Sequence, residues 1–84
     1  MLNMRLDKFL KVSRLIKRRT VANEVSEMGR VFVNTRPAKP AKQLNEGDII
    51  EIEYANRTLR ARILKIPTGN VSIQEASLLY ELID

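Results

Sequence analysis

The first third of the chain places apolar residues with the period of a helix. In "RLDKFLKVSRLI", Leu6, Phe9 and Leu10 fall at positions i, i+3 and i+4, which predicts an amphipathic helix. Asp7 suits the positive end of that helix's dipole. The segment "SRLIKRR" then turns the chain, and we expect Leu15 and Ile16 to pack into the core there.

A second helix is predicted over "RTVANEVSEMG". Gly29 is placed to cap its C-terminus, because glycine readily adopts the left-handed backbone conformation that is common there. This arrangement puts the basic run "KRR", residues 17–19, at the N-terminus of the second helix. The expected apolar stripe consists of Val21, Ala22, Val25 and Met28.

The middle of the chain has the two-residue period of β-strands. "RVFVN" predicts a short strand with a turn beginning at Asn34 and Thr35, whereas the prolines of "RPAKPAKQLNEGD" argue against regular structure. "DIIEIEY" and "TLRARILKI" predict a hairpin with Asn56 and Arg57 in its loop and a strand end or bulge near Leu64. The expected cross-strand pairs are Tyr54 with Leu59, Ile52 with Ala61, Ile50 with Ile63, Glu53 with Arg60, and Glu51 with Arg62.

The segment "SIQEASLLYELID" predicts a C-terminal helix over about residues 72–83. Ser72 and Glu75 have the spacing of a capping box. We expect the helix to pack back on the sheet through one face, made of Ile73, Ala76, Leu79, Tyr80 and Ile83. The whole pattern predicts one α+β domain over residues 1–84, with two N-terminal helices packed on a small, mainly antiparallel sheet.

The residue types exclude much of enzymology. The chain has neither histidine nor cysteine, so imidazole bases, thiolate nucleophiles, disulfides and the usual zinc sites are absent. The glycines are isolated, so there is no glycine-rich phosphate loop. Glu51 and Glu53 are better explained as partners of sheet arginines than as an acid–base couple. We therefore expect no enzymatic activity, no cofactor and no metal.

The sequence also bounds the cellular location. No apolar run approaches the roughly 20 residues of a membrane-spanning helix, and the opening "MLNM" lacks the layout of a signal peptide. We expect a cytoplasmic monomer without membrane contact. Met4 is an alternative start, with the first three residues as an extension.

The positive charge is confined to one part of the chain. Residues 1–36 hold nine basic and three acidic residues, a net charge of +6, whereas residues 37–84 hold six basic and seven acidic residues, a net charge of −1. With a sequence pI near 10.0, this asymmetry indicates an anionic partner. The four aromatic residues, Phe9, Phe32, Tyr54 and Tyr80, all fit apolar stripes, so core packing is favoured over base stacking.

The run "KRR" is unfavourable for stability alone. Cations at a helix N-terminus oppose the macrodipole by about 0.3–1 kcal/mol each, but the free backbone N–H groups there can hold a phosphate. An anion site and a merely solvated surface both remain open interpretations. Lys8, Lys11 and Arg14 recur every three residues and so share a flank of the first helix.

Two helices, the second ending in "EMGRVFVN", followed by a basic loop and "L-x-x-GDII", resemble the S-four domain, the RNA-binding domain named after ribosomal small-subunit protein four. The resemblance covers about residues 4–66 and implies the S-four-like (alpha-L) fold. The start, "MRLDKFLKVSRLIKRRTVANEV", is more specifically similar to the RqcP family of bacterial ribosome-associated quality-control factors. A small heat-shock protein that rescues stalled large ribosomal subunits is a more distant relative.

This resemblance implies binding to split large ribosomal subunits that still carry peptidyl-tRNA, through large-subunit ribosomal RNA and tRNA near the P site. It also implies a partner factor that delivers alanyl-tRNA and template-free addition of alanine tails to the stalled chain. In the family, the arginine that begins "RLDKFL" and the last arginine of "KRR" matter for binding, and these are Arg5 and Arg19 here. The candidate RNA-binding residues are Arg5, Lys8, Lys11, Arg14, Lys17, Arg18, Arg19, Lys39 and Lys42.

The basic loop departs from the family pattern. Thr35 stands where many members have glycine, and Pro37 and Pro40 are further differences, so the roles of Lys39 and Lys42 follow less directly. Four alternatives remain: a heat-shock-type factor that rescues large subunits without tailing, a stand-alone ribosomal-RNA-binding module in ribosome assembly, the targeting domain of an RNA-modifying enzyme, and a protein-interaction domain that uses the final helix. We expect no catalytic domain after residue 84, which argues against the enzyme-targeting alternative.

Overall fold

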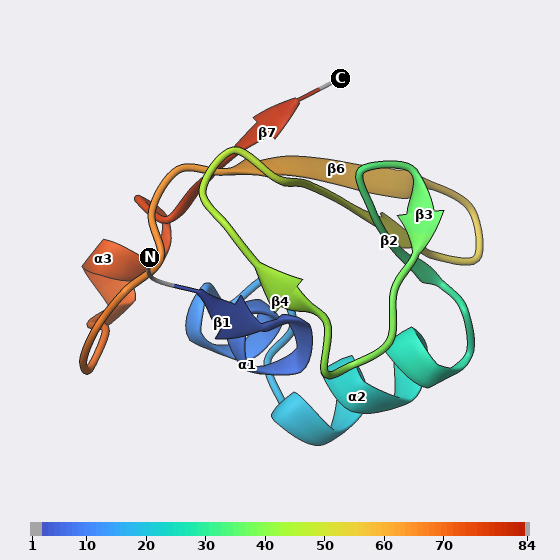
Figure 1. Cartoon of the computed structure of the whole chain (residues 1–84), viewed down its shortest axis with the longest axis horizontal. Coiled ribbons are helices and arrows are strands. Elements are labelled where there is room, and N and C mark those ends of the chain that lie inside the picture. Colours follow the sequence, from blue (N-terminus) through green and yellow to red (C-terminus); the bar gives the residue numbers. More distant parts are fainter. Residues whose placement is uncertain (1–2, 84) are drawn as a thin grey trace.

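The computed structural model describes residues 3–83 and shows a helical layer beneath an antiparallel sheet (Figure 1). The helices are α1 (Leu6–Val12), α2 (Arg19–Glu27) and α3 (Ile73–Ala76). The strands are β1 (Met4–Arg5), β2 (Val31–Val33), β3 (Arg36–Pro37), β4 (Gln43–Leu44), β5 (Ile49–Glu53), β6 (Thr58–Ile63) and β7 (Tyr80–Ile83). Five strands form an antiparallel sheet in the order β3-β2-β5-β6-β7, and β1 pairs with β4 separately. The predicted α+β class is confirmed.

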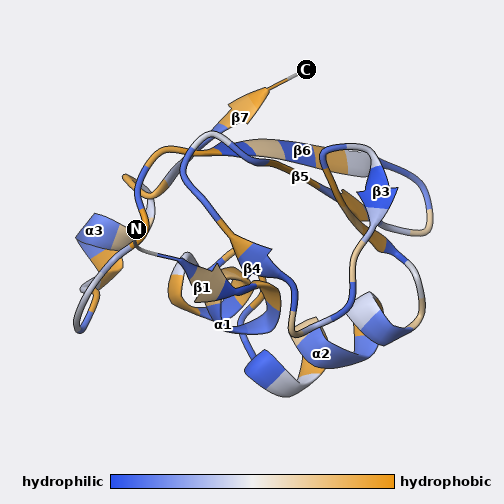
Figure 2. Cartoon of the chain, in the orientation of Figure 1, coloured by the Kyte–Doolittle hydropathy of each residue, from blue (hydrophilic) through white to orange (hydrophobic). Residues whose placement is uncertain are grey.

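The core lies between α1 and the inner face of the sheet, and Figure 2 shows hydrophobic segments in both layers. Leu6, Phe9 and Leu10 are fully buried, as their helical spacing predicts. From the sheet, Ile50 and Ile52 alternate with more exposed residues and point into the same core. Ile16 is buried and Leu15 packs against the core, so the expected turn between the helices is confirmed.

Helix α2 begins and ends where the sequence predicts, but its buried face differs. Gly29 has φ +76°, its N–H donates to the carbonyl of Ser26, and the next N–H, that of Arg30, donates to Val25. These two bonds are the Schellman arrangement that ends many helices. Val21 and Met28 are exposed by 41% and 64%, so their placement in the apolar stripe is wrong. The buried face is instead formed by Ala22, Val25 and Ser26.

The turn after β2 is a tight hairpin. Asn34 and Thr35 have φ values of +51° and +72°, and Val33 pairs with Arg36, which defines a two-residue loop of type I′. The Asn34 side chain holds this turn, since its amide donates to Asp48 at 3.1 Å and its oxygen accepts from the N–H of Ile49 at 3.0 Å. The following segment was expected to lack regular structure, but it contains the two-residue strands β3 and β4.

The β5–β6 hairpin has the predicted faces but a different register. Ile52 pairs with Leu59 and Ile50 with Ala61, so each expected partner is displaced by two residues. A shift of two keeps the side chains of the paired residues, Ile49–Glu53 and 58–62, on their predicted faces. The physical reason is the loop: Asn56-Arg57 lacks the glycine of a tight turn, and the turn is instead centred on Ala55 and Asn56, where the N–H of Tyr54 donates to the carbonyl of Arg57. Tyr54 is therefore exposed rather than part of the inner face.

The C-terminal helix over residues 72–83 is also wrong in its extent. The N-cap is confirmed, because the Ser72 hydroxyl accepts from the N–H of Glu75, but α3 ends at Ala76. Residues Tyr80–Ile83 form β7, which pairs antiparallel with β6. The outer edge of β6 offers unpaired main-chain groups, and pairing with them satisfies the backbone better than continuing a short helix whose apolar residues face solvent. Ala76 and Leu79 of the expected apolar face are buried, whereas Ile73 is 68% exposed, so that face forms only in part.

The end of β6 at Ile63 confirms the predicted strand end near Leu64. Within residues 3–83, none of the helices has the length and apolar character needed to span a bilayer.

Candidate nucleic-acid interface

A buried carboxylate joins the starts of the first two helices. Asp7 is 3% exposed and lies in the first turn of α1. The Arg5 guanidinium donates two hydrogen bonds to it at 3.1 Å, and Arg19 Nη2, from the start of α2, lies 3.4 Å from the same carboxylate. Asn23 Nδ2 donates to Asp7 Oδ2 at 3.3 Å. We call these four residues, Arg5, Asp7, Arg19 and Asn23, the Asp7 cluster.

The cluster keeps Asp7 ionised. Burial works to raise the pKa of Asp7, but the hydrogen bonds from Arg5 and Asn23 and the positive charges of Arg19 and Arg5 outweigh it. The net result is a pKa below the ordinary value of 3.8. The carboxylate therefore holds both arginines at neutral pH, while their side chains stay 44% and 48% exposed. Two fixed and half-exposed guanidinium groups are suited to bidentate contacts with phosphate oxygens.

The two helix N-termini differ in what occupies them. At α1, the N–H groups of Leu6 and Asp7 donate to the carbonyls of Lys42 and Pro40, so the basic loop covers that end. At α2, Arg18 is the N-cap residue and its side chain makes no capping hydrogen bond. Within the part of the chain described by the structure, no hydrogen bond satisfies the first N–H groups of α2. The run "KRR" thus lies at an open helix N-terminus, as its position in the sequence predicts.

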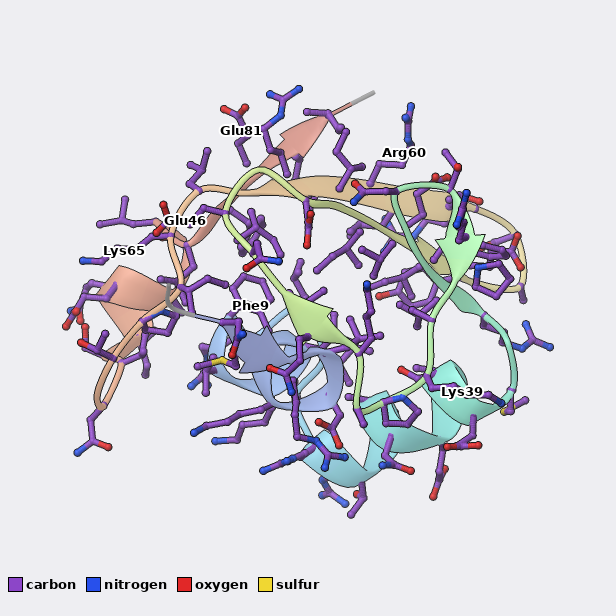
Figure 3. The ribbon with its side chains drawn as sticks, viewed as in Figure 1. Phe9, Lys39, Glu46, Arg60, Lys65 and Glu81 are labelled. Atoms are coloured by element: carbon purple, nitrogen blue, oxygen red, sulfur yellow. The ribbon has the colours of Figure 1, made fainter. Side chains whose placement is uncertain are left out.

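Nitrogen-ended side chains project from α1 and from the start of α2 on the side away from the sheet (Figure 3). The structure divides the sequence-predicted set into separate groups. Arg5 and Arg19 meet at the Asp7 cluster, and Lys17 and Arg18 precede Arg19 in the chain. Lys8, Lys11 and Arg14 do not join them but line a different hollow, with the loop of residues 67–71.

The loop lysines are a third group. Lys39, which Figure 3 labels above α2, lies 3.7 Å from the Glu27 carboxylate, with both side chains well exposed. An exposed pair of this kind contributes little to stability and does not fix the lysine strongly. Lys42 lines a hollow with Arg36 and Asn34 beside the β2–β3 hairpin.

Three residues at these sites, Asp7, Asn23 and Arg36, are not among those predicted from the sequence to bind RNA. Asp7 was assigned only to the helix dipole, although it also ties the two helices together. Asn23 had a usable signal, because it lies four residues after Arg19 and so shares a helix face with it. Arg36 lies beside Lys42 only because the hairpin folds back, which spacing along the chain does not show. Among residues 3–83, no group of three or more His, Cys, Asp or Glu side chains is placed to hold a metal ion.

Comparison with known proteins identifies the class first. The S4 domain family matches residues 4–50, which include both helices of the Asp7 cluster and the strands β2, β3 and β4. In solved structures, the chain is similar to the trimeric structure of Vibrio cholerae Heat Shock Protein 15, with a TM-score of 0.86 and 32% identity over 98% of this chain and 83% of that chain.

Two curated relatives are more specific. The "RQC P-site tRNA stabilizing factor" of Halalkalibacterium halodurans is 49% identical over 94% of this chain and 89% of its own length. The protein of the same name from Listeria monocytogenes is 46% identical over 95% of this chain and 86% of its own length. The chain belongs to this family of S4-domain proteins, the RQC P-site tRNA stabilizing factors. The resemblance stated from the opening residues is confirmed.

Proposed function

We propose that this protein stabilises P-site tRNA in bacterial ribosome quality control, on large subunits that have split from a stalled ribosome and still carry peptidyl-tRNA. The observation that carries the proposal is the Asp7 cluster, in which one buried carboxylate holds Arg5 and Arg19 side by side and half exposed. The names of the relatives support the same function. The protein acts in the cytoplasm as a monomer and needs no cofactor.

In the proposed mechanism, the basic helical layer binds phosphates of large-subunit ribosomal RNA and of the tRNA. Phosphate contacts fix register and orientation without reading sequence, which suits a factor that holds a structured RNA in place. The protein is a binding factor and supplies no catalytic group; peptide-bond chemistry belongs to the ribosome. With a partner that delivers alanyl-tRNA, holding the peptidyl-tRNA supports repeated, template-free addition of alanine.

The proposal is tested by Arg19→Ala and, separately, Arg5→Ala. Each change removes a charge-assisted contact of about 1.5–3 kcal/mol, so we expect binding to large subunits to weaken by roughly tenfold or more. Co-sedimentation with purified large subunits that carry peptidyl-tRNA measures this. Arg57→Ala is the matched control, because Arg57 lies over the Tyr54 ring in the β5–β6 loop and its loss also lowers the net charge by one.

If Arg5→Ala and Arg19→Ala both co-sediment as the wild type does, the site assignment is wrong. Sequencing of the RNA captured with the protein from cells tests the function itself, since large-subunit RNA together with tRNA is expected and messenger RNA would contradict the proposal.

A second candidate is a heat-shock-type factor that rescues large subunits without tailing, which the likeness to Heat Shock Protein 15 favours. The identity to the quality-control relatives is higher, at 49% against 32%, and we therefore prefer the first. A reconstituted reaction separates them. The reaction contains stalled large subunits, alanyl-tRNA and its delivering partner, with or without this protein. We expect longer alanine tails in the presence of the protein than in its absence. Tails of equal length would favour the second candidate.

A further inference from the structure

A second basic hollow lies apart from the Asp7 cluster. Three bases line it, Lys8, Lys11 and Arg14, and the loop of residues 67–71 forms its other wall. It shares no lining residue with the hollow at the Asp7 cluster, which is lined by Asp7, Arg19, Thr20, Asn23 and Glu24. We call it the α1 groove. It brings together the flank of α1 and a loop more than 50 residues later in the chain.

The chemistry of the α1 groove is that of an anion site. No carboxylate lines it, and within residues 3–83 Lys8, Lys11 and Arg14 form no ion pair. The facing loop presents the Thr68 hydroxyl and the Asn70 amide, both exposed, and neither side chain makes a hydrogen bond within the described part of the chain. Three unpaired cations therefore face a wall of uncharged hydrogen-bonding groups.

Arg14 occupies a backbone position that normally takes glycine. Its φ is +63°, and its N–H donates to the carbonyl of Lys11 just after α1 ends. Gly29 has the corresponding position after α2, with φ +76° and a matching bond to Ser26. The other left-handed non-glycine residues of the described chain, Asn34 and Thr35, belong to a hairpin turn that requires this conformation. Local structure thus gives no reason for arginine rather than glycine at residue 14.

We propose that the α1 groove holds the sugar–phosphate backbone of an RNA strand and that Arg14 binds a phosphate there. The strained backbone is retained because the side chain is needed for binding. The proposal rests on the proposed function for RNA binding as such and adds a second contact surface to it. The groove and the Asp7 cluster then offer RNA phosphates two surfaces with different lining residues.

Arg14→Gly gives two effects of opposite sign. Glycine removes the cost of the left-handed backbone at residue 14 and should raise the Tm by roughly 4 °C. Loss of one phosphate contact should weaken binding to protein-free large-subunit RNA. It should also reduce the magnitude of the slope of log K against log[salt] by about 0.7–0.9. Two controls isolate these effects. Thr35→Gly relieves the same backbone strain, and Arg57→Gly removes the same charge; neither should change RNA binding as Arg14→Gly does.

A cross-link locates the strand. The chain has no cysteine, so Asn70→Cys introduces a single thiol that can carry a photoreactive group, with Asn56→Cys in the β5–β6 loop as the control. RNA cross-links are expected from residue 70 and not from residue 56. Unchanged affinity and salt slope in Arg14→Gly would overturn the proposal, and so would cross-links from residue 70 to ribosomal protein alone. Failure of the wild type to bind large subunits would instead overturn the proposed function.

Discussion

At the scale of single residues, Asp7 organises the candidate site. It lies 12 residues before Arg19 and 16 before Asn23, and spacing along the chain gives no sign that Asp7 meets either of them. Arg5 and Arg19 could be named from a family motif, but their shared partner depends on how α1 packs against α2. A buried carboxylate with several donors both fixes the arginines and makes stability depend on pH.

We predict that Asp7→Asn weakens binding to large subunits although it raises the net charge from +5 to +6. The amide removes the charge that holds the two guanidinium groups, so they lose their fixed geometry. A surface acting through net charge alone would bind more tightly. Co-sedimentation at one fixed salt concentration distinguishes the two results, and tighter binding would contradict the positioning role of Asp7.

The same change should alter the pH dependence of folding. The pKa of Asp7 is lower in the folded protein than its ordinary value of 3.8, so the unfolded chain binds the proton more readily. The stabilisation is complete at neutral pH and is lost as the pH falls through about 4 toward the lowered pKa of Asp7. We expect Asp7→Asn to lower the free energy of unfolding by about 1–3 kcal/mol at pH 7 and by much less near pH 3. Urea unfolding at both pH values measures the difference; an equal loss at both would contradict it.

At the scale of elements, the sequence is most informative where side chains alone decide the structure. The helical spacing of Leu6, Phe9 and Leu10, the cap at Gly29 and the alternation in β5 and β6 are all found as predicted. The register of β5 against β6 depends on a loop without glycine, and the strand β7 depends on the free edge of β6. Both are decided by main-chain pairing between distant segments, which a local pattern does not encode.

A pair of glycines tests the capping of α2. Gly29→Ala meets no atom within 4 Å of the added Cβ, so its cost comes from the left-handed backbone and should be about 1 kcal/mol. Gly69→Ala also has open space and no positive φ, and it should be neutral or stabilise by about 0.4–1 kcal/mol through the unfolded state. Thermal unfolding of both variants gives the comparison. A Tm for Gly29→Ala at or above that of Gly69→Ala would contradict this account of the cap.

At the scale of the whole molecule, the charges separate with the layers. Six of the nine basic residues in residues 1–36 lie on α1, α2 and the connection between them, whereas the sheet neutralises its own charges. Arg60 lies 3.8 Å from Glu51 and Arg62 lies 2.5 Å from Glu81. The helical layer therefore presents the positive potential that an RNA partner requires, and the sheet layer does not.

This separation predicts a steep salt dependence. Binding through six or more phosphates should lose about 10³ in affinity or more between 50 and 200 mM salt, because each contact releases counterions. Titration of protein-free large-subunit RNA at four salt concentrations measures the slope. A nearly flat dependence would favour the protein-interaction alternative.

The position of strand β7 determines which end of the protein is suitable for immobilisation on a bead. It runs along the outer edge of the sheet, and the chain leaves it at the C-terminal end marked in Figure 1, above the sheet and away from α1 and α2. A tether joined there would leave the helical layer facing outward. The protein immobilised through that end should still capture its ribosomal partner from solution, whereas a tether placed ahead of β1 would be attached close to Arg5 of the Asp7 cluster and should hinder capture.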